Sequence, residues 1–226
     1  MVKVVIVSTS ASDLKGHATG LWIEECATPY YMFKAKGFDV VLASTSGGAI
    51  PIDATSMADA FFTDASKRFL HDAEAMGAFS HSIKVSTIDW AGVDAIYMAG
   101  GHGTCVDFVQ STELHDAIAH IYKMGKIVAA DCHGPIALCH VSKPDGTPLL
   151  QGVTATGFAD SEEVAVQLDK IVPYMLEAKM KELGAKYEKA DDWNPKVCVD
   201  GKIVTGQNPQ SSEVCAEAVI QLLASA

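Results

Sequence analysis

Residues 127–138 read Ile-Val-Ala-Ala-Asp-Cys-His-Gly-Pro-Ile-Ala-Leu, and this stretch indicates both the fold class and the chemistry. An apolar run ends at Asp131, Cys132 and His133 follow, and Gly134-Pro135 opens a second apolar run. Proline suits the first turn of a helix. A strand that runs through a sharp turn into a helix is the layout of a nucleophile elbow, with cysteine in the place of serine. The stretch therefore predicts a nucleophile, although a buried structural cysteine at a tight turn fits the same residues.

The predicted position of Cys132 at a helix start has a consequence for its ionisation. Unpaired amides and the helix dipole favour a thiolate there, so we expect a reactive thiol. No CxxC spacing occurs, which argues against zinc-ribbon and thioredoxin-like proteins. The remaining cysteines are predicted to be small buried hydrophobic residues: Cys26, Cys105, Cys139, Cys198 and Cys215.

Strand and helix patterns alternate along the chain in both directions from this stretch. Strands are predicted at residues 2–8, 38–44, 93–99, 127–131, 153–158 and 202–205. Helices are predicted at residues 30–36, 57–76, 112–124, 162–183 and 211–224. This alternation predicts a flavodoxin-like, doubly wound α/β fold, with a mostly parallel sheet and helices on both faces. We expect one domain over residues 1–226, with a small cap insertion between residues 53 and 89.

Composition and charge exclude several classes of protein. Of the 226 residues, 49% are hydrophobic and 20% charged, which is typical of globular proteins and not of disordered, collagen-like or coiled-coil ones. The net charge of −11 argues against nucleic acid and anionic membranes as partners, since both attract basic patches. No apolar run reaches the roughly 18 residues of a membrane span. Residues 1–8 fit a first strand better than a signal peptide, so we predict a cytoplasmic protein.

Two other strand ends carry residues suited to chemistry, because ligands of such sheets bind beyond the carboxyl ends of the strands. Residues 97–104 form a glycine-rich turn whose backbone amides could supply half of an oxyanion hole. Residues 19–29 place Glu24 and Glu25 among apolar residues ahead of a helix. A buried carboxyl there would have a raised pKa and could act as an acid or base, whereas a solvated pair in a first helical turn is the simpler alternative.

Five motifs, spread in order over nearly the whole chain, resemble the ThiJ/PfpI superfamily, which has the class I glutamine-amidotransferase-like fold. The likeness is strongest to its branch of glutathione-independent glyoxalases III and stress-induced chaperones. The motifs are KGHATGLWIEECATP at 15–29, AGGHGTCVD at 99–107, ADCHGP at 130–135, TGFADSEE at 156–163 and DGKIVTGQNP at 200–209.

The resemblance implies roles for the matching residues. The family's nucleophile matches Cys132 and its neighbouring histidine matches His133. The family's protonated glutamate, which touches the cysteine sulfur, matches Glu25, whereas Glu24 is out of frame. One departure is visible, since the residue before the cysteine is usually small or apolar in this branch and is Asp131 in this chain. A carboxylate there could repel a thiolate or point into a neighbouring network.

The acidic third member of the family's triad matches Glu163, with Asp160 and Glu162 close enough in sequence to compete for that role. The family's oxyanion hole and substrate contacts match backbone positions at Gly101, His133 and Gly103.

The reaction implied by the resemblance converts methylglyoxal and related 2-oxoaldehydes into 2-hydroxy acids, without glutathione, metal or organic cofactor. Cys132 adds to the aldehyde carbon, Glu25 moves a proton between adjacent carbons through an enediol, and water releases lactate. His133, oriented by Glu163, relays protons to and from the cysteine. The resemblance also implies a homodimer.

Two other functions remain open. A cysteine hydrolase or deglycase would keep the elbow without needing Glu25. A holdase chaperone would instead use an exposed apolar patch, for which Trp22, Trp90 and Trp193 are candidates. The remaining histidines are scattered, and His115 and His120 do not share a helix face, so we predict no metal site.

Overall fold

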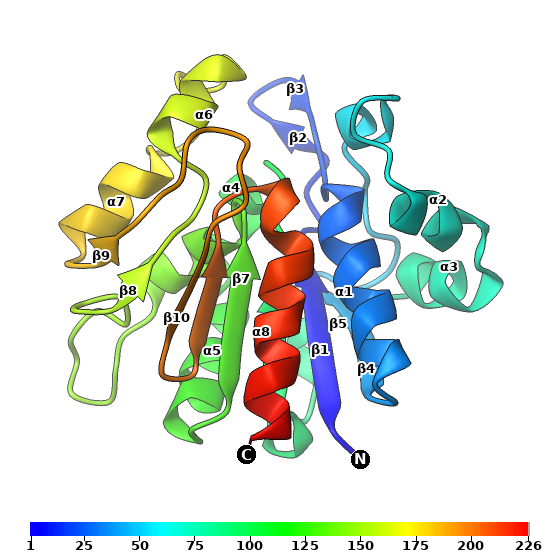
Figure 1. Cartoon of the computed structure of the whole chain (residues 1–226), viewed down its shortest axis with the longest axis horizontal. Coiled ribbons are helices and arrows are strands. Elements are labelled where there is room, and N and C mark those ends of the chain that lie inside the picture. The colour runs from blue at the N-terminus through cyan, green and yellow to red at the C-terminus, as the bar shows by residue number, and fades with distance from the viewer. Residues whose placement is uncertain (226) are drawn as a thin grey trace.

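A central sheet of seven strands carries helices on both faces in the computed structural model, which describes residues 1–225 (Figure 1). The strand order is β10-β11-β7-β6-β1-β4-β5, and only the β10–β11 pair is antiparallel. The predicted doubly wound, mostly parallel fold is therefore confirmed. The strands are β1 (Lys3–Ser8), β4 (Asp39–Ser44), β5 (Ile83–Lys84), β6 (Ala95–Met98), β7 (Ile127–Asp131), β10 (Val197–Asp200) and β11 (Ile203–Gly206).

Helices and two small strand pairs complete the described structure. The α-helices are α1 (Ile23–Ala35), α2 (Asp64–His71), α3 (Ala73–Ser80), α4 (Thr104–Asp107), α5 (Thr112–Lys123), α6 (Asp160–Ala165), α7 (Leu176–Glu182) and α8 (Ser212–Ala224). The 3-10 helices are η1 (Ala54–Met57), η2 (Val85–Thr87), η3 (Trp90–Gly92), η4 (Gly134–His140) and η5 (Pro209–Ser211). Outside the main sheet, β2 (Asp13–Leu14) pairs with β3 (His17–Ala18), and β8 (Thr154–Ala155) pairs with β9 (Lys186–Tyr187).

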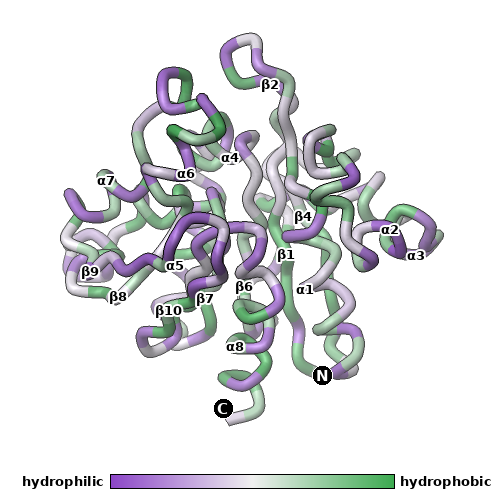
Figure 2. Tube along the Cα trace, turned by 45° about the horizontal axis from the view of Figure 1, so that its top comes forward, coloured by the Kyte–Doolittle hydropathy of each residue, from purple (hydrophilic) through white to green (hydrophobic). Residues whose placement is uncertain are grey.

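Strand β1 shows how the sheet builds two cores. Successive side chains of a strand point to opposite faces. Val5 and Val7 therefore pack into the core that includes α5, and Val4 and Ile6 into the core that includes α1 and α8. Figure 1 shows α1 and α8 in front of the sheet and α5 behind it. In Figure 2 the trace of β1 is mostly hydrophobic, whereas hydrophilic colours gather on outer helices such as α7.

The long helix predicted over residues 162–183 is wrong. The chain forms α6 and α7 instead, separated by residues 166–175. Gln167 adopts a left-handed φ of 62°, and Pro173, which has no backbone N–H, lies in the gap. The break brings the first turn of α6 to the sheet edge, where the site lies.

The region predicted to form a cap over the site also has a different structure from the one expected. Residues 57–76 are not one helix, because Asp72 ends α2 and its carboxylate accepts hydrogen bonds from the backbone N–H groups of Glu74 and Ala75 at the start of α3. Phe69 of α2 packs on Tyr30 of α1, so these helices cover α1 and not the site.

Other elements also differ from the sequence predictions. The helix expected at residues 30–36 begins at Ile23, and the strand expected at 153–158 shortens to β8, outside the main sheet. Strand β10 was not predicted; it pairs with β11 across the turn at Gly201-Lys202. No described helix has the length and apolarity that a membrane span requires.

Candidate active site

The turn after β7 has the strained geometry of an elbow. Cys132 follows the strand directly and has a φ of 54°, a left-handed conformation that costs a non-glycine residue on the order of 1–3 kcal/mol. Its N–H donates to the Gly206 carbonyl at 3.0 Å, and its own carbonyl accepts from Phe158 N–H at 2.8 Å. A Cβ at Gly134 would lie 2.2 Å from the Met98 carbonyl oxygen. Neighbouring backbone on both sides therefore holds the cysteine in this conformation.

A hydrogen-bonded row leads away from the Cys132 sulfur. Cys132 Sγ lies 3.4 Å from His133 Nδ1, and His133 Nε2 lies 2.7 Å from Glu163 Oε2. The second oxygen of Glu163 lies 2.8 Å from His102 Nε2. A carboxylate only accepts hydrogen bonds, so both imidazoles place a proton on Nε2. The structure thus brings the predicted cysteine, histidine and glutamate together, with His102 on the far side of the glutamate.

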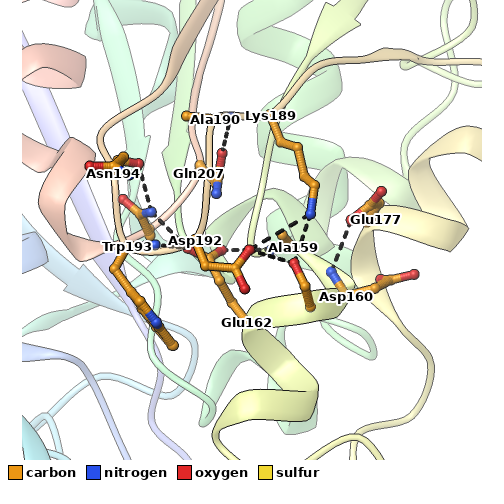
Figure 3. Close-up of polar contacts among 12 residues, drawn as sticks. Ala159, Asp160, Glu162, Glu177, Lys189, Ala190, Asp192, Trp193, Asn194 and Gln207 are labelled. Atoms are coloured by element: carbon orange, nitrogen blue, oxygen red, sulfur yellow. Dashed lines mark hydrogen bonds and ion pairs between the residues drawn. The ribbon is translucent and has the colours of Figure 1, made fainter.

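The two competing acids are engaged elsewhere. Asp160 Oδ1 accepts a hydrogen bond from Ala178 N–H. Glu162 accepts three, from the backbone N–H of Ala159 and Trp193 and from the Asn208 amide. Figure 3 shows Glu162 beneath the loop that carries Trp193 and Asn194, so this acid fixes the loop to α6. Of the three candidates, Glu163 is therefore the one that the structure places against His133.

The pKa values in this row favour a neutral histidine and an ionised glutamate. Burial, reinforced by His102, lowers the pKa of His133 to about 4, although Glu163 acts in the opposite direction. Burial alone would raise the pKa of the Glu163 carboxyl, but His133 and His102 outweigh it and hold that pKa below its ordinary value. At neutral pH, His133 Nδ1 is thus a free acceptor for the thiol proton of Cys132.

The expectation that a helix N-terminus makes Cys132 a thiolate is wrong. The elbow leads into the 3-10 helix η4 and not into an α-helix. Burial, followed by the charges of Glu25 and Asp131, raises the pKa of the Cys132 thiol well above its ordinary value. These surroundings oppose ionisation of the thiol, so a neighbouring base such as His133 Nδ1 would help to remove its proton.

Glu25 lies in the first turn of α1 and is fully buried beside Cys132. Its Oε2 accepts a hydrogen bond from Gly100 N–H at 2.7 Å, and a Cβ at Gly100 would lie 2.6 Å from that oxygen. Burial, then the charge of Asp131, raises the pKa of Glu25 well above its ordinary value. The neighbouring Glu24 is only partly buried, and burial raises its pKa to about 7. The structure thus places Glu25, the acid in the motif frame, beside the sulfur.

Two of the three predicted backbone groups reach the site. Within residues 1–225, the amides of Gly101 and His133 have no hydrogen-bond acceptor, as an oxyanion hole requires. Gly101 has a φ of 96°, and a Cβ there would lie 2.4 Å from the Gly20 carbonyl oxygen. The structure does not bring Gly103 to the site, because its N–H donates to that same Gly20 oxygen at 3.3 Å.

A cavity of about 480 Å³ opens over Cys132. Its walls are mostly apolar, and aromatic side chains come from four separate segments: Trp22, Phe61, Phe158 and Trp193. Polar residues at the rim include His17, Asp53 and Thr55. The 53–61 segment is thus the part of the expected cap that reaches the site. Sequence reasoning missed His102 as a site residue, although the motif at 99–107 contains it.

The described residues contain one cluster whose donor atoms lie close enough for a metal ion: His102, His133 and Glu163, within 4.8 Å of one another. Both imidazole Nε2 atoms already face the two Glu163 oxygens. A cation would have to break both hydrogen bonds, so the arrangement serves a proton path better than a metal.

Fold and site together define an α/β protein with a cysteine on a strained elbow at the carboxyl edge of a parallel sheet. The chain belongs to the DJ-1/PfpI family, which it matches over residues 18–222. It is 32% identical to Glyoxalase 3 of Candida albicans, over 97% of this chain and 98% of that protein.

Two solved structures are similar over nearly the full length. The crystal structure of glyoxalase III from Candida albicans has a TM-score of 0.91 at 30% identity, covering 97% of this chain and 96% of that one. The X-ray structure of Rapid Encystment Protein 24 kDa from Francisella tularensis has a TM-score of 0.94 at 36% identity, covering 99% of each chain.

Proposed function

We propose that this protein is a glutathione-independent glyoxalase, a lyase that converts methylglyoxal and related 2-oxoaldehydes into 2-hydroxy acids. One observation carries the proposal: Cys132, which lines the cavity, lies beside both a histidine–glutamate pair and a buried glutamate whose pKa is raised. The names of the glyoxalase relatives support it. We further propose that the protein acts in the cytoplasm as a homodimer.

The first step forms a bond between Cys132 and the substrate. His133 Nδ1 takes the thiol proton while Sγ attacks the aldehyde carbon, and the carbonyl electron pair moves onto oxygen. The amides of Gly101 and His133 stabilise that oxygen, which then takes the proton from His133 to complete a hemithioacetal. Glu163 keeps the imidazole in the required tautomer throughout.

The second step moves a proton between carbons. Glu25, as a carboxylate, removes the hydrogen of the former aldehyde carbon and returns it to the neighbouring carbon through an enediol, while the hydroxyl proton of the hemithioacetal moves to the neighbouring ketone oxygen. The product is a thioester of Cys132, which water hydrolyses to the 2-hydroxy acid and the free thiol. One substrate carbon is oxidised and its neighbour reduced, so the reaction balances without a redox cofactor.

The test is lactate formation from methylglyoxal in the absence of glutathione. The wild type should produce lactate, and Cys132→Ser should produce almost none, because a serine hydroxyl is far less ionisable than a thiol. Cys139→Ser is the matched control, because Cys139 is also buried after the elbow but does not line the cavity. An inactive wild type, or an active Cys132→Ser variant, would refute the proposal.

A cysteine-dependent hydrolase or deglycase is the second candidate, and the cavity favours it. Its volume of about 480 Å³ and its aromatic walls exceed what a three-carbon aldehyde needs. Such an enzyme would use Cys132, His133 and the two amides but would not need Glu25. Assays with amide and ester substrates on the same preparations distinguish the two functions.

A further inference from the structure

Asp131, the last residue of β7, is a fully buried carboxyl directly behind the elbow. Its Oδ2 accepts hydrogen bonds from Tyr97 Oη and Ser212 Oγ, both at 2.8 Å. Its Oδ1 is buried and has no hydrogen-bond partner within residues 1–225. The resemblance to the family predicts a small or apolar residue at this position, so the carboxyl is a feature of this chain that the mechanism has not used.

Glu25 is the immediate neighbour of this carboxyl. Glu25 Oε2 accepts a hydrogen bond from Gly100 N–H. Glu25 Oε1 is buried and has no hydrogen-bond partner within residues 1–225, as is also true of Asp131 Oδ1. Each acid therefore keeps one free oxygen in a dry interior. Two carboxylates in contact there repel each other strongly, so one proton stays on the pair.

Within residues 1–225, no lysine or arginine is among the groups that shift the pKa values of the pair. The titratable neighbours are Glu24 and Cys26 from α1, Tyr97 from β6, Cys132, and Glu213 and Cys215 from α8. None of these side chains is a cation that could neutralise two carboxylates. The two hydroxyl donors on Asp131 Oδ2 favour its ionised form, and therefore a resting state in which the proton is on Glu25.

We propose that Asp131 and Glu25 share a single proton, and that Asp131 takes this proton when Glu25 acts as the carbon base. This inference rests on the proposed glyoxalase function. The O–H bond of Glu25 breaks, an O–H bond forms on Asp131, and the charge of the pair stays at minus one. The electron pair left on Glu25 then takes the substrate proton and later returns it to the adjacent carbon. Asp131 acts only through Glu25 and is a positioning residue.

The pH dependence of the reaction follows from this sharing. Burial raises the pKa of Asp131 to about 7 and raises that of Glu25 well above its ordinary value. Below about pH 7 both acids are protonated, so no base is present. Above pH 7 the pair holds one proton, and the fraction of molecules in which Glu25 is the ionised partner does not change with pH. In the Asp131→Asn variant, Glu25 can only lose its proton to solvent. The fraction of Glu25 that is a carboxylate therefore increases about tenfold per pH unit until the pH reaches the raised pKa of Glu25.

The experiment compares the pH profiles of kcat/KM for methylglyoxal in wild type, Asp131→Asn and Ser212→Ala. The wild-type profile should level off near pH 7, the pKa of Asp131. The Asp131→Asn profile should coincide with wild type at low pH and keep rising above pH 7, by up to about tenfold per pH unit, because no Asp131 charge holds the proton on Glu25. Ser212→Ala, which removes one donor to Asp131, should move the pH at which the profile levels off upward. Glu113→Gln is the control, because Glu113 is an exposed acid of α5 outside the neighbours of the pair, and it should keep the wild-type profile.

Parallel profiles, with a loss that is the same at every pH, would reduce Asp131 to a structural role and overturn the inference, as would an Asp131→Asn profile that levels off near pH 7 like that of the wild type. If the wild type forms no lactate, the proposed function fails, and the shared proton is then tested by infrared spectroscopy. The carboxylic-acid C=O band that Glu25→Gln removes should persist to higher pH in wild type than in Asp131→Asn. Loss of the band at the same pH in both proteins would refute the shared proton by itself.

Discussion

Glu24 and Glu25 are adjacent in sequence, but the first turn of α1 places them in different surroundings. Glu25 contacts Gly100 N–H and Cys132, whereas Glu24 is partly exposed. If Glu25 transfers the proton, the reaction requires a carboxyl at residue 25 and does not require one at residue 24. The two residues therefore form a matched pair for testing which acid moves the proton.

We expect Glu25→Gln to lower the turnover of methylglyoxal by roughly 10²–10⁴, the usual contribution of a general acid–base group. Glutamine has the same shape and can still contact Gly100, but it cannot accept and return a proton. Glu24→Gln should change turnover little. Lactate formation without glutathione measures both. Full activity of Glu25→Gln would favour the hydrolase, and a loss only in Glu24→Gln would reassign the acid–base residue.

At the scale of elements, the site depends on how closely β6 and the elbow approach each other. Gly134, the first residue of η4, lies directly against the Met98 carbonyl at the end of β6. Both sides of this contact are backbone, which cannot turn aside as a flexible side chain can. A larger residue there must push the cysteine turn away from the sheet edge.

Gly134→Ala should therefore destabilise the fold by about 1–3 kcal/mol and lower activity more than stability alone explains, since a Cβ would lie 2.2 Å from the Met98 oxygen. Gly77→Ala in α3 is the control, because nothing lies within 4 Å of a Cβ there and alanine favours a helix. Urea unfolding and lactate assays on both variants provide the measurement. A Gly134→Ala variant as stable and active as wild type would contradict the tight contact.

At the scale of the whole molecule, the proposed homodimer predicts a solution mass of twice 23.9 kDa. Large apolar side chains are exposed on the described surface, among them Val164, Val199 and Val214. Static light scattering at tens of micromolar should report the doubled mass. A mass near 23.9 kDa at that concentration would refute the dimer.

Strand positions in the middle of the sheet were predictable because each strand is a continuous apolar run. The strand at 127–131 was predicted with its observed bounds, and α5 was predicted to within one residue. The helix over 162–183 was wrong because its periodicity continues across Pro173, and only tertiary packing shows where the chain turns. Strand β10 was not predicted because its pairing with β11 determines that it is a strand, and its own residues carry no clear strand pattern.

The sequence by itself determined which residues could do chemistry: the Cys132-His133 elbow and the glycine-rich turn follow from local order along the chain, and the resemblance to the family selected Glu25 over Glu24. Tertiary structure alone decided how those groups ionise and which of them meet. It selected Glu163 over Asp160 and Glu162, added His102, left Gly103 out and raised the pKa of the Cys132 thiol by burying it beside two acids. The physical reason is that a pKa depends on burial and on charges brought together from distant segments, and the order of residues specifies neither.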